Sequence, residues 1–357
     1  MTKAARAIYE TSTDPRDRSL VSSGEGRGAS SSRYRELTAL VRNHCLLRKI
    51  PAYYCGKMAL NFVLLGCGLV VLAKAPGLRL RMGDAIFLAF VFTQMGFIVH
   101  DAGHYQIFRR RWLNDAIGIL HANLTLGFSY TRWVTTHNQH HSHPNQLGKD
   151  PDTDFPVLAF TATQAREKSG LRRWIVRHQA YLFFPLLLFE AVSLKLDCIR
   201  FLLEERVAYR RVELGCLVIH FVVYFGLLMY WLGAVEATLF IVVHQAAFGL
   251  YLGMAIAPNH IGMPVLRYEA DLDFLTRQAL TTRNLRRHWL TDYLYGPLSC
   301  QIEHHLFPTI PIAALRKTQS VVQPYFEAHG IPYHEVTPLE SYREILRALH
   351  NVSAGAK

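Results

Sequence analysis

The chain has 357 residues, of which 50% are hydrophobic and 18% are charged. An average soluble domain contains about 25% charged residues, so this composition favours a membrane protein over a soluble one. The net charge of +12 comes from basic residues that lie beside apolar segments, where the cytoplasmic flanks of membrane helices carry them. This placement argues against a nucleic-acid-binding protein.

The N-terminal segment, residues 1–33, is polar, basic and rich in Ser and Gly, with no apolar stretch typical of a signal peptide. We predict a disordered cytoplasmic tail there. From Tyr34 to Lys49, apolar residues recur at helical spacing among arginines. This pattern fits either a helix lying on the membrane surface or an ordinary soluble cap.

Two apolar segments follow, Met58–Ala73 and Ala85–Val99, and each is long enough with its flanks to cross a bilayer. The second segment leads directly to His100 and His104. Three arginines, Arg109–Arg111, come immediately afterwards, and by the positive-inside rule this end is cytoplasmic.

The segment Trp112–Tyr130 is apolar but interrupted by polar residues, so we expect a helix at the membrane interface or lining the core. It leads into a second group of histidines, His137, His140 and His141. The loop Asp150–Pro156 comes next, and its aspartates are either partners of metal-bound imidazoles or ordinary solvated turn residues.

Three more apolar segments are Ala180–Leu196, Leu214–Leu232 and Thr238–Ala257. If all the histidine groups serve one site, the chain must cross the membrane an even number of times between the second group and the third. The last two segments are separated by a few residues and predict a hairpin, whereas the first contains Pro185 and Glu190 and is assigned to the interface. The sequence therefore predicts four transmembrane helices with both termini in the cytoplasm.

A third histidine motif, Gln301-Ile-Glu-His304-His305, follows the last span. His260 comes just where that span ends and is a further candidate ligand. Two other histidines, His220 and His244, fall inside spans, and we expect them to be packed or hydrogen-bonded residues and not ligands.

Seven of the 18 histidines lie in these three motifs, at spacings that place them on one face of a helix. Neutral imidazole is a common ligand of iron, zinc and copper. A hydrolytic zinc site needs three or four ligands, so the number of imidazoles instead favours two irons that react with O2. The six cysteines form no CxxC pair, and we interpret them as reduced packing residues.

The motifs HDAGH, HNQHH and QIEHHLFP, in this order around two pairs of apolar segments, resemble the three histidine boxes of membrane fatty acid desaturases. A third box that opens with Gln is similar to the front-end and related bacterial acyl-CoA desaturase branch. The resemblance covers roughly residues 34–311, which we predict to be the desaturase domain, with residues 312–357 as a cytoplasmic C-terminal segment. It implies an all-α integral membrane protein with four transmembrane helices, interfacial helices and a cytoplasmic histidine-rich diiron domain.

The resemblance also implies the site and its chemistry. Two non-haem irons would use O2 and two electrons to place a cis double bond in a fatty acyl chain carried on CoA, an acyl carrier protein or a lipid. The implied iron ligands are His100, His104, His137, His140, His141, His260, His304 and His305. Residues that could bind iron or hydrogen-bond to its ligands are Gln301, His143, Asp101 and Asn259.

Many eukaryotic front-end desaturases carry a fused cytochrome b5 domain with an HPGG motif, and this motif does not occur in the sequence. We therefore expect electrons from a separate ferredoxin or cytochrome b5 with its reductase. Two alternatives stay open at this point. Hydroxylation, acetylenation or ketolation of a lipid chain could occur on the same diiron scaffold. A non-enzymatic metal transporter is more remote, since its histidines should lie along a path across the membrane.

Overall fold

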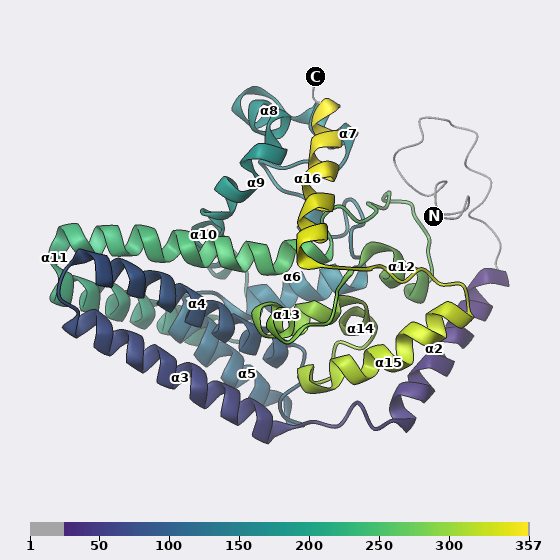
Figure 1. Cartoon of the computed structure of the whole chain (residues 1–357), viewed down its shortest axis with the longest axis horizontal. Helices are drawn as coiled ribbons and strands as arrows, with labels where there is room; N and C mark the ends of the chain where they lie inside the picture. The colour runs from purple at the N-terminus through teal and green to yellow at the C-terminus, as the bar shows by residue number, and fades with distance from the viewer. Residues whose placement is uncertain (1–24, 356–357) are drawn as a thin grey trace. The chain divides into compact units, whose positions relative to one another are not determined.

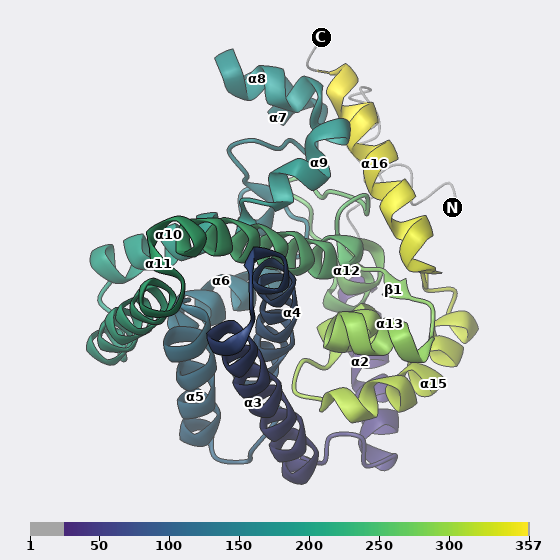
Figure 2. The ribbon, with the colours of Figure 1, turned by 60° about the vertical axis from the view of Figure 1, so that its left-hand side comes forward.

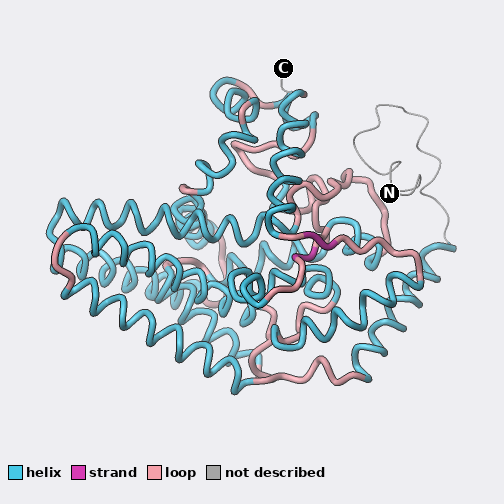
Figure 3. Tube along the Cα trace, viewed as in Figure 1, coloured by secondary structure: helices cyan, strands magenta, loops and turns pink. Residues whose placement is uncertain are grey.

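The computed structural model describes residues 25–355 and divides the chain into two compact units. One unit contains the chain up to Leu47, Thr136–Phe183 and the part from Ile256 onward; the other contains Arg48–Thr135 and Phe184–Ala255. The division falls within helix α6. Regular structure in the described part is helical apart from two strands of two residues each, drawn in magenta in Figure 3. The predicted all-α class is confirmed.

The second unit, which we call the bundle unit, holds the long apolar helices. In Figures 1 and 2 helices α3, α4 and α11 run side by side, and Leu72, Leu88 and Phe240 join them in one core. The helices of this unit, with α6 and α9 extending beyond it, are α3 (Pro51–Lys74), α4 (Leu78–Gly103), α5 (Arg111–Ile119), the π-helix η2 (Leu120–Leu126), α6 (Tyr130–Ser142), α9 (Gln179–Leu187), α10 (Glu190–Glu204) and α11 (Arg210–Ile256).

Helices α3 and α4 contain the first two predicted spans and are joined by a tight turn. Pro51 stands in the first turn of α3, where its missing N–H has no partner to lose. Gly77, just before α4, has a φ of 84°, a conformation that side chains rarely adopt. The turn therefore returns the chain without a long loop.

Helix α11 is a hairpin of two helical arms, and these arms are the predicted segments Leu214–Leu232 and Thr238–Ala257. Gly233 breaks the helix with φ 70° and ψ 174°. The hydroxyl of Tyr224 lies 2.9 Å from Nδ1 of His244, a contact between residues twenty apart that a straight helix would hold about 30 Å apart. His220 is also hydrogen-bonded, through Nδ1 to the carbonyl of Leu124 at 3.1 Å, as expected for histidines inside a span.

Three helical segments in the described part are long and apolar enough to cross a membrane: Pro51–Lys74, Leu78–Gly103 and Arg210–Asn259. The segment Ala180–Leu196, predicted to stay at the interface, is divided between α9 and α10, and neither helix has the length of a span. The predicted interfacial segment Trp112–Tyr130 forms α5 and η2.

The first unit, which we call the histidine-rich unit, consists of helices of up to 19 residues and one parallel strand pair, with Asn284 opposite Glu335. Strand β1 contacts Ala257–Asn259, Gly296–Cys300 and Gln301–Leu306 within this unit. Besides parts of α6 and α9, its elements are α2 (Glu25–Asn43), η3 (Pro151–Thr153), α7 (Ala162–Glu167), α8 (Gly170–Arg177), η4 (Ala257–Asn259), α12 (Phe274–Thr281), β1 (Asn284–Leu285), α13 (Trp289–Tyr295), η5 (Gly296–Cys300), α14 (Gln301–Leu306), α15 (Ile312–Ala328), β2 (Glu335–Val336) and α16 (Pro338–Ala354).

Helix α2 packs into the core of the histidine-rich unit. Leu37 and Val41 are fully buried in a cluster with Ile302 and Phe326, so one face of this helix packs on protein. The choice between a membrane-surface helix and a cap stays a prediction. Most of the predicted disordered tail, residues 1–33, lies outside the described residues, although its last residues, from Glu25, belong to α2. The boundary predicted at residue 311 stays a prediction.

Candidate metal centre

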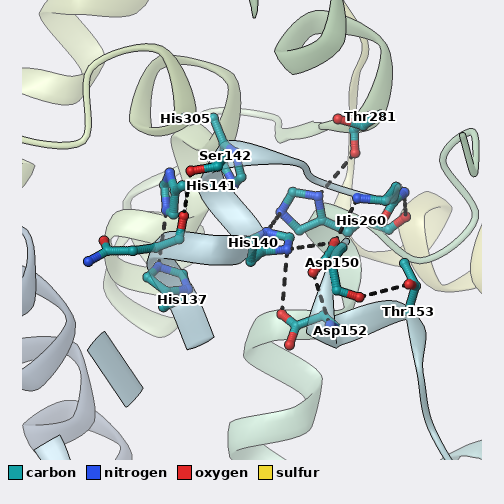
Figure 4. Close-up of polar contacts among 12 residues, drawn as sticks. His137, His140, His141, Ser142, Asp150, Asp152, Thr153, His260, Thr281 and His305 are labelled. Carbon is teal, nitrogen blue, oxygen red and sulfur yellow. Dashed lines mark hydrogen bonds and ion pairs between the residues drawn. The ribbon is translucent and has the colours of Figure 1, made fainter. Parts of the chain in front are cut away.

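The second histidine box lies on helix α6, which brings its three imidazoles to one side. His137 and His141 are one turn apart, and their Nε2 atoms are 3.1 Å from each other. His140 points from the same helix toward His260, as Figure 4 shows. The sequence spacing thus produces a row of ring nitrogens at the C-terminal end of α6.

The protonation of His140 is fixed by an aspartate from the loop that follows. Its Nδ1 lies 2.9 Å from Oδ2 of the buried Asp150, and a carboxylate can only accept a hydrogen bond. Nδ1 therefore carries the proton, and in the neutral ring Nε2 presents a lone pair. Asp152 is half exposed, and its Oδ2 is more distant from the same nitrogen, at 3.6 Å.

His260 is fixed in the same way by a backbone carbonyl. It follows the short helix η4, and its Nδ1 lies 3.0 Å from the carbonyl oxygen of Thr281. Since a carbonyl oxygen only accepts, Nδ1 is again the N–H and Nε2 the lone pair. Asn145 holds the loop in place by donating from Nδ2 to the carbonyls of His260 and Pro264 at 3.0 and 3.2 Å.

The third histidine box forms the short helix α14, whose residues are all buried. Nδ1 of His305 lies 2.8 Å from Oε1 of Gln278, on helix α12. The amide nitrogen of Gln278 donates to the carbonyl of His141 at 2.8 Å, which fixes the amide orientation. His305 must therefore donate through Nδ1, and its Nε2 has no hydrogen-bond partner among the described residues.

These three assignments converge on one group of atoms. The candidate ligand atoms of His140, His260 and His305 lie within 4.8 Å of one another. Nε2 of His140 and Nε2 of His260 are 3.2 Å apart, and when both rings are neutral these two lone pairs cannot hydrogen-bond to each other. Lone pairs that face one another in a buried site are the arrangement expected around a cation.

The electrostatic environment keeps two of the three imidazoles neutral. Burial lowers the pKa of His260 and His305 well below its usual value, and neighbouring imidazoles add to the effect. Burial also disfavours charge on His140, but the hydrogen bond and the charge of Asp150 outweigh it and raise the pKa of His140. Neutral imidazoles beside one carboxylate-bound imidazole suit binding to iron, zinc or copper.

A second set of ring nitrogens gathers around His141. Its Nε2 lies 3.1 Å from Nε2 of His137 and 3.1 Å from Nε2 of His304. The rings of His141 and His305 are stacked, with centroids 4.1 Å apart, so the two sets adjoin within the histidine-rich unit. Six of the eight predicted ligands are thus neighbours.

The other two predicted ligands, His100 and His104, lie at the end of α4 in the bundle unit. Their ring centroids are 4.9 Å apart. Nδ1 of His100 donates to the carboxylate of Asp101 at 3.1 Å, the role expected of a residue that orients a ligand. His100 therefore has the same kind of carboxylate support as His140.

The remaining candidates differ in their surroundings. Nε2 of Gln301 lies 3.0 Å from Nε2 of His260, which places this side chain beside the candidate centre. Both polar side-chain atoms of Asn259 are buried without a hydrogen-bond partner in the described part of the chain, so a bound water or ligand could satisfy them. His143 belongs to none of the clusters of three potential ligands among residues 25–355.

Several residues that position ligands carry no signal in the sequence. Three such residues are Gln278, Asn145 and Thr281. Each contacts a ligand-bearing segment more than 20 positions away in the chain. Asn145 also donates its backbone N–H to the nearby Asp150. Asn145 has a φ of 54°, a conformation that Asn adopts more readily than most residues, but this is visible only in the structure.

The comparisons with known proteins agree with the family resemblance that the sequence motifs indicated. A family model described as "Fatty acid desaturase" matches residues 82–337. An acyl-lipid (9-3)-desaturase of Physcomitrium patens is 29% identical over 334 residues, 90% of this chain and 63% of that protein. A delta(8)-fatty-acid desaturase of Euglena gracilis is 29% identical over 314 residues, 84% of this chain and 73% of that protein.

A delta(5) fatty acid desaturase of Caenorhabditis elegans is 28% identical over 265 residues, 70% of this chain and 59% of that protein. The chain thus spans less than two thirds of the moss and nematode relatives, at 63% and 59% of their lengths. The matched region runs from α4 through β2 and contains all three histidine boxes. The chain belongs to the fatty acid desaturase family.

Proposed function

We propose that this chain is a membrane-bound, O2-dependent oxidoreductase that introduces a cis double bond into a fatty acyl chain. One observation carries the proposal: the candidate ligand atoms of His140, His260 and His305 lie within 4.8 Å of one another in a chain of the desaturase family. Imidazole nitrogens of this kind suit iron, and the eight histidines proposed as ligands exceed the three or four ligands of a hydrolytic zinc site.

Two non-haem irons are the proposed cofactor. Once bound, they would supply the redox chemistry by which O2 removes two hydrogens from an unactivated acyl chain. The proposed ligands are His100, His104, His137, His140, His141, His260, His304 and His305. Gln301 and Asn259 are proposed to contact the metals or waters bound to them.

The protein's own contribution is to fix the ligands before metal arrives. Asp150, Gln278 and the carbonyl of Thr281 each hold a ring N–H, which turns one Nε2 toward the centre. Imidazoles held in this way lose little freedom on binding, so the centre is assembled at low entropic cost. The acyl chain must be held equally firmly, because a small displacement from the reacting geometry costs rate.

The proposed topology is four transmembrane crossings with the metal site and both termini in the cytoplasm. Helices α3 and α4 would each cross once, and α11 would cross twice through its two arms, since Gly233 reverses the chain between them. Arg109–Arg111, immediately after α4, support a cytoplasmic position for that end.

The proposed substrate is a fatty acyl chain, and the proposed partners are membrane lipid and a separate electron donor. The Euglena gracilis relative is named a fatty-acid desaturase, and the Physcomitrium patens relative is named an acyl-lipid desaturase. For this chain the carrier is left as CoA, acyl carrier protein or lipid. A ferredoxin or cytochrome b5 with its reductase would deliver the two electrons.

The test is a fatty acid profile by gas chromatography and mass spectrometry, with double bonds located by derivatisation. A host would express the native chain or the His304→Ala/His305→Ala variant together with a ferredoxin and its reductase. We expect a new unsaturated acid with the native chain alone. A hydroxylated, alkynyl or keto product would show that the chain catalyses another oxidation and not desaturation. A native chain that binds no iron would overturn the proposal.

A further inference from the structure

Two consecutive residues, Arg283 and Asn284, connect the segments that carry proposed ligands. Both are fully buried in the histidine-rich unit, and Asn284 begins strand β1. A buried arginine is rare because its charge loses water, so it must be compensated by its contacts. The contacts of these two side chains lead to different parts of the candidate centre.

Arg283 holds the turn around His260 through three backbone carbonyls. Its backbone N–H donates to the carbonyl of Asn259 at 3.0 Å, Nε donates to Pro258 at 2.6 Å, and Nη2 donates to Ile261 at 2.8 Å. These carbonyls belong to the residues on both sides of His260. The planar guanidinium thus fixes the direction in which that imidazole leaves the chain.

Asn284 holds the third histidine box. Its Oδ1 accepts from the backbone N–H of Ile302 at 2.8 Å, and its Nδ2 donates to Oε2 of Glu303 at 2.7 Å. Ile302 and Glu303 stand between Gln301 and His304 in helix α14. Tyr333 completes the network by donating to Oε1 of Glu303 at 2.7 Å.

Residues near the C-terminus form an ion pair with Arg283 and a hydrogen bond with Asn284. The guanidinium of Arg283 forms an ion pair with Glu344 on α16, and Glu344 also accepts a hydrogen bond from His334 at 3.1 Å. Nδ2 of Asn284 lies 2.6 Å from the hydroxyl of Tyr333, just before β2. Residues after the third box therefore contribute to the geometry of the centre.

We propose that Arg283 and Asn284 are positioning residues that set the distance between His260 and the third histidine box. Because they are adjacent in the chain, a shift of one ligand-bearing segment is transmitted to the other through a single peptide bond. The rings of His260 and His305 have centroids 4.7 Å apart, and the pair of side chains keeps this separation. The inference rests on the proposed metal site, but not on the choice of acyl substrate.

The test compares Arg283→Lys with Arg316→Lys in the full chain. Lysine keeps the charge opposite Glu344 but cannot reach Pro258 and Ile261 together. Arg316 is a matched control, since it also pairs with a carboxylate, Asp292, and donates to the backbone carbonyl of Leu285 at 3.2 Å, away from His260. Measurements are iron per chain after dialysis against a chelator, the spectroscopic signature of the bound iron, and the melting temperature of the metal-free protein.

We expect Arg283→Lys to weaken iron binding by about 10- to 100-fold and to change the iron spectrum, as loss of ligand-orienting contacts does elsewhere. Arg316→Lys should bind iron with the native spectrum, whatever its melting temperature. Native iron binding and spectrum in Arg283→Lys would overturn the inference. So would equal loss of iron and stability in both variants. A native chain without iron would overturn the proposed function and this inference with it.

A second pair of variants tests Asn284. Asn284→Asp places two carboxylates together, because Glu303 is the partner of Nδ2, and we expect iron to be lost. Asn284→Asp with Glu303→Gln exchanges the amide and the carboxylate, restores a hydrogen bond between the two side chains, and should recover most of the iron. No recovery in the double variant, in protein that melts at the native temperature, would contradict the assigned role of Asn284.

Discussion

At the scale of single residues, the candidate centre depends on hydrogen-bond acceptors that face Nδ1 of its imidazoles. Each acceptor keeps the proton of the neutral ring on Nδ1 and leaves Nε2 without one. Asp150 has both carboxylate oxygens occupied: Oδ2 accepts from Nδ1 of His140 at 2.9 Å and from the N–H of Asn145 at 2.7 Å, and Oδ1 accepts from the N–H of Asp152 at 2.9 Å. Every contact brings a donor to the carboxylate. A side chain that offers a donor of its own cannot replace it.

Asp150→Asn is therefore expected to weaken iron binding, although it changes few atoms. The amide of the new Asn has one NH2 group, which cannot accept a hydrogen bond. In one orientation this NH2 faces the ring N–H of His140, and in the other it faces the backbone N–H of Asp152. Either His140 loses its acceptor or the loop loses a hydrogen bond. We expect a loss of about 10- to 100-fold in metal affinity, measured by competition with a chelator.

Asp152→Asn is the control for this change. Its carboxylate is 52% exposed and lies 3.6 Å from the same nitrogen, so the substitution should leave metal affinity near the native value. Equal effects of the two substitutions would show that general negative charge matters here, and not the orientation of His140.

At the scale of elements, helix α6 is held at its N-terminal end by hydrogen bonds to Glu213, in addition to the contacts of its histidines. The buried carboxylate of Glu213 accepts from the hydroxyl of Ser129 at 2.6 Å and from the N–H of Thr131 at 3.1 Å. A carboxylate at the first turn of a helix satisfies free N–H groups and complements the helix dipole. The start of α6 is thereby anchored to α11 within the bundle unit.

The turn before α6 needs a glycine. Gly127 ends the π-helix η2 with a φ of 77°, and a Cβ there would lie 2.6 Å from the His220 ring and 3.2 Å from Cε of Lys195. Gly127→Ala should cost about 1–2 kcal/mol for the backbone and about 1–3 kcal/mol more for the overlap. A fall in melting temperature of the purified protein in detergent measures the sum.

Gly330→Ala separates the two contributions. Gly330 has a φ of 64°, but no atom lies within 4 Å of the position that its Cβ would take. This variant should therefore lose the backbone contribution alone. A melting temperature for Gly127→Ala that is no lower than that of Gly330→Ala would mean that the His220 ring moves aside at no cost.

At the scale of the whole molecule, the parts predicted from the sequence are those set by local patterns. The apolar segments predicted α3, α4 and the two arms of α11, because the length and hydropathy of a span are local properties. The histidine spacing likewise predicted which imidazoles of α6 and α14 would be neighbours. The chain's membership of the desaturase family followed from the same motifs.

The parts that the sequence did not predict depend on contacts between distant segments. Gln278 contacts His141, 137 positions away, and Arg283 contacts Glu344, 61 positions away. Neither residue stands in a motif, and a buried arginine contradicts the usual preference for the surface. The burial of α2 was left open for the same reason, since an amphipathic helix can cover a core or a membrane.

The topology is the remaining property of the whole molecule that an experiment can decide. Helix α11 has 47 residues, about 70 Å if straight, whereas the apolar part of a bilayer is about 30 Å thick. The break at Gly233 lets α11 cross twice, so that α3, α4 and both arms make an even number of crossings. The connection after Gly233 should then lie on the side opposite the C-terminus.

Cysteine labelling in intact cells tests this arrangement, with the exposed native cysteines Cys45, Cys55 and Cys67 replaced by serine. Val235→Cys, at a side chain that is 75% exposed, and Leu78→Cys, at one that is 41% exposed, should react with a membrane-impermeant maleimide. His350→Cys on α16 should react only after the membrane is permeabilised. Labelling of His350→Cys in intact cells would place the C-terminus outside. Protection of Val235→Cys until permeabilisation would mean that the arms of α11 do not both cross, which would overturn the arrangement with four crossings.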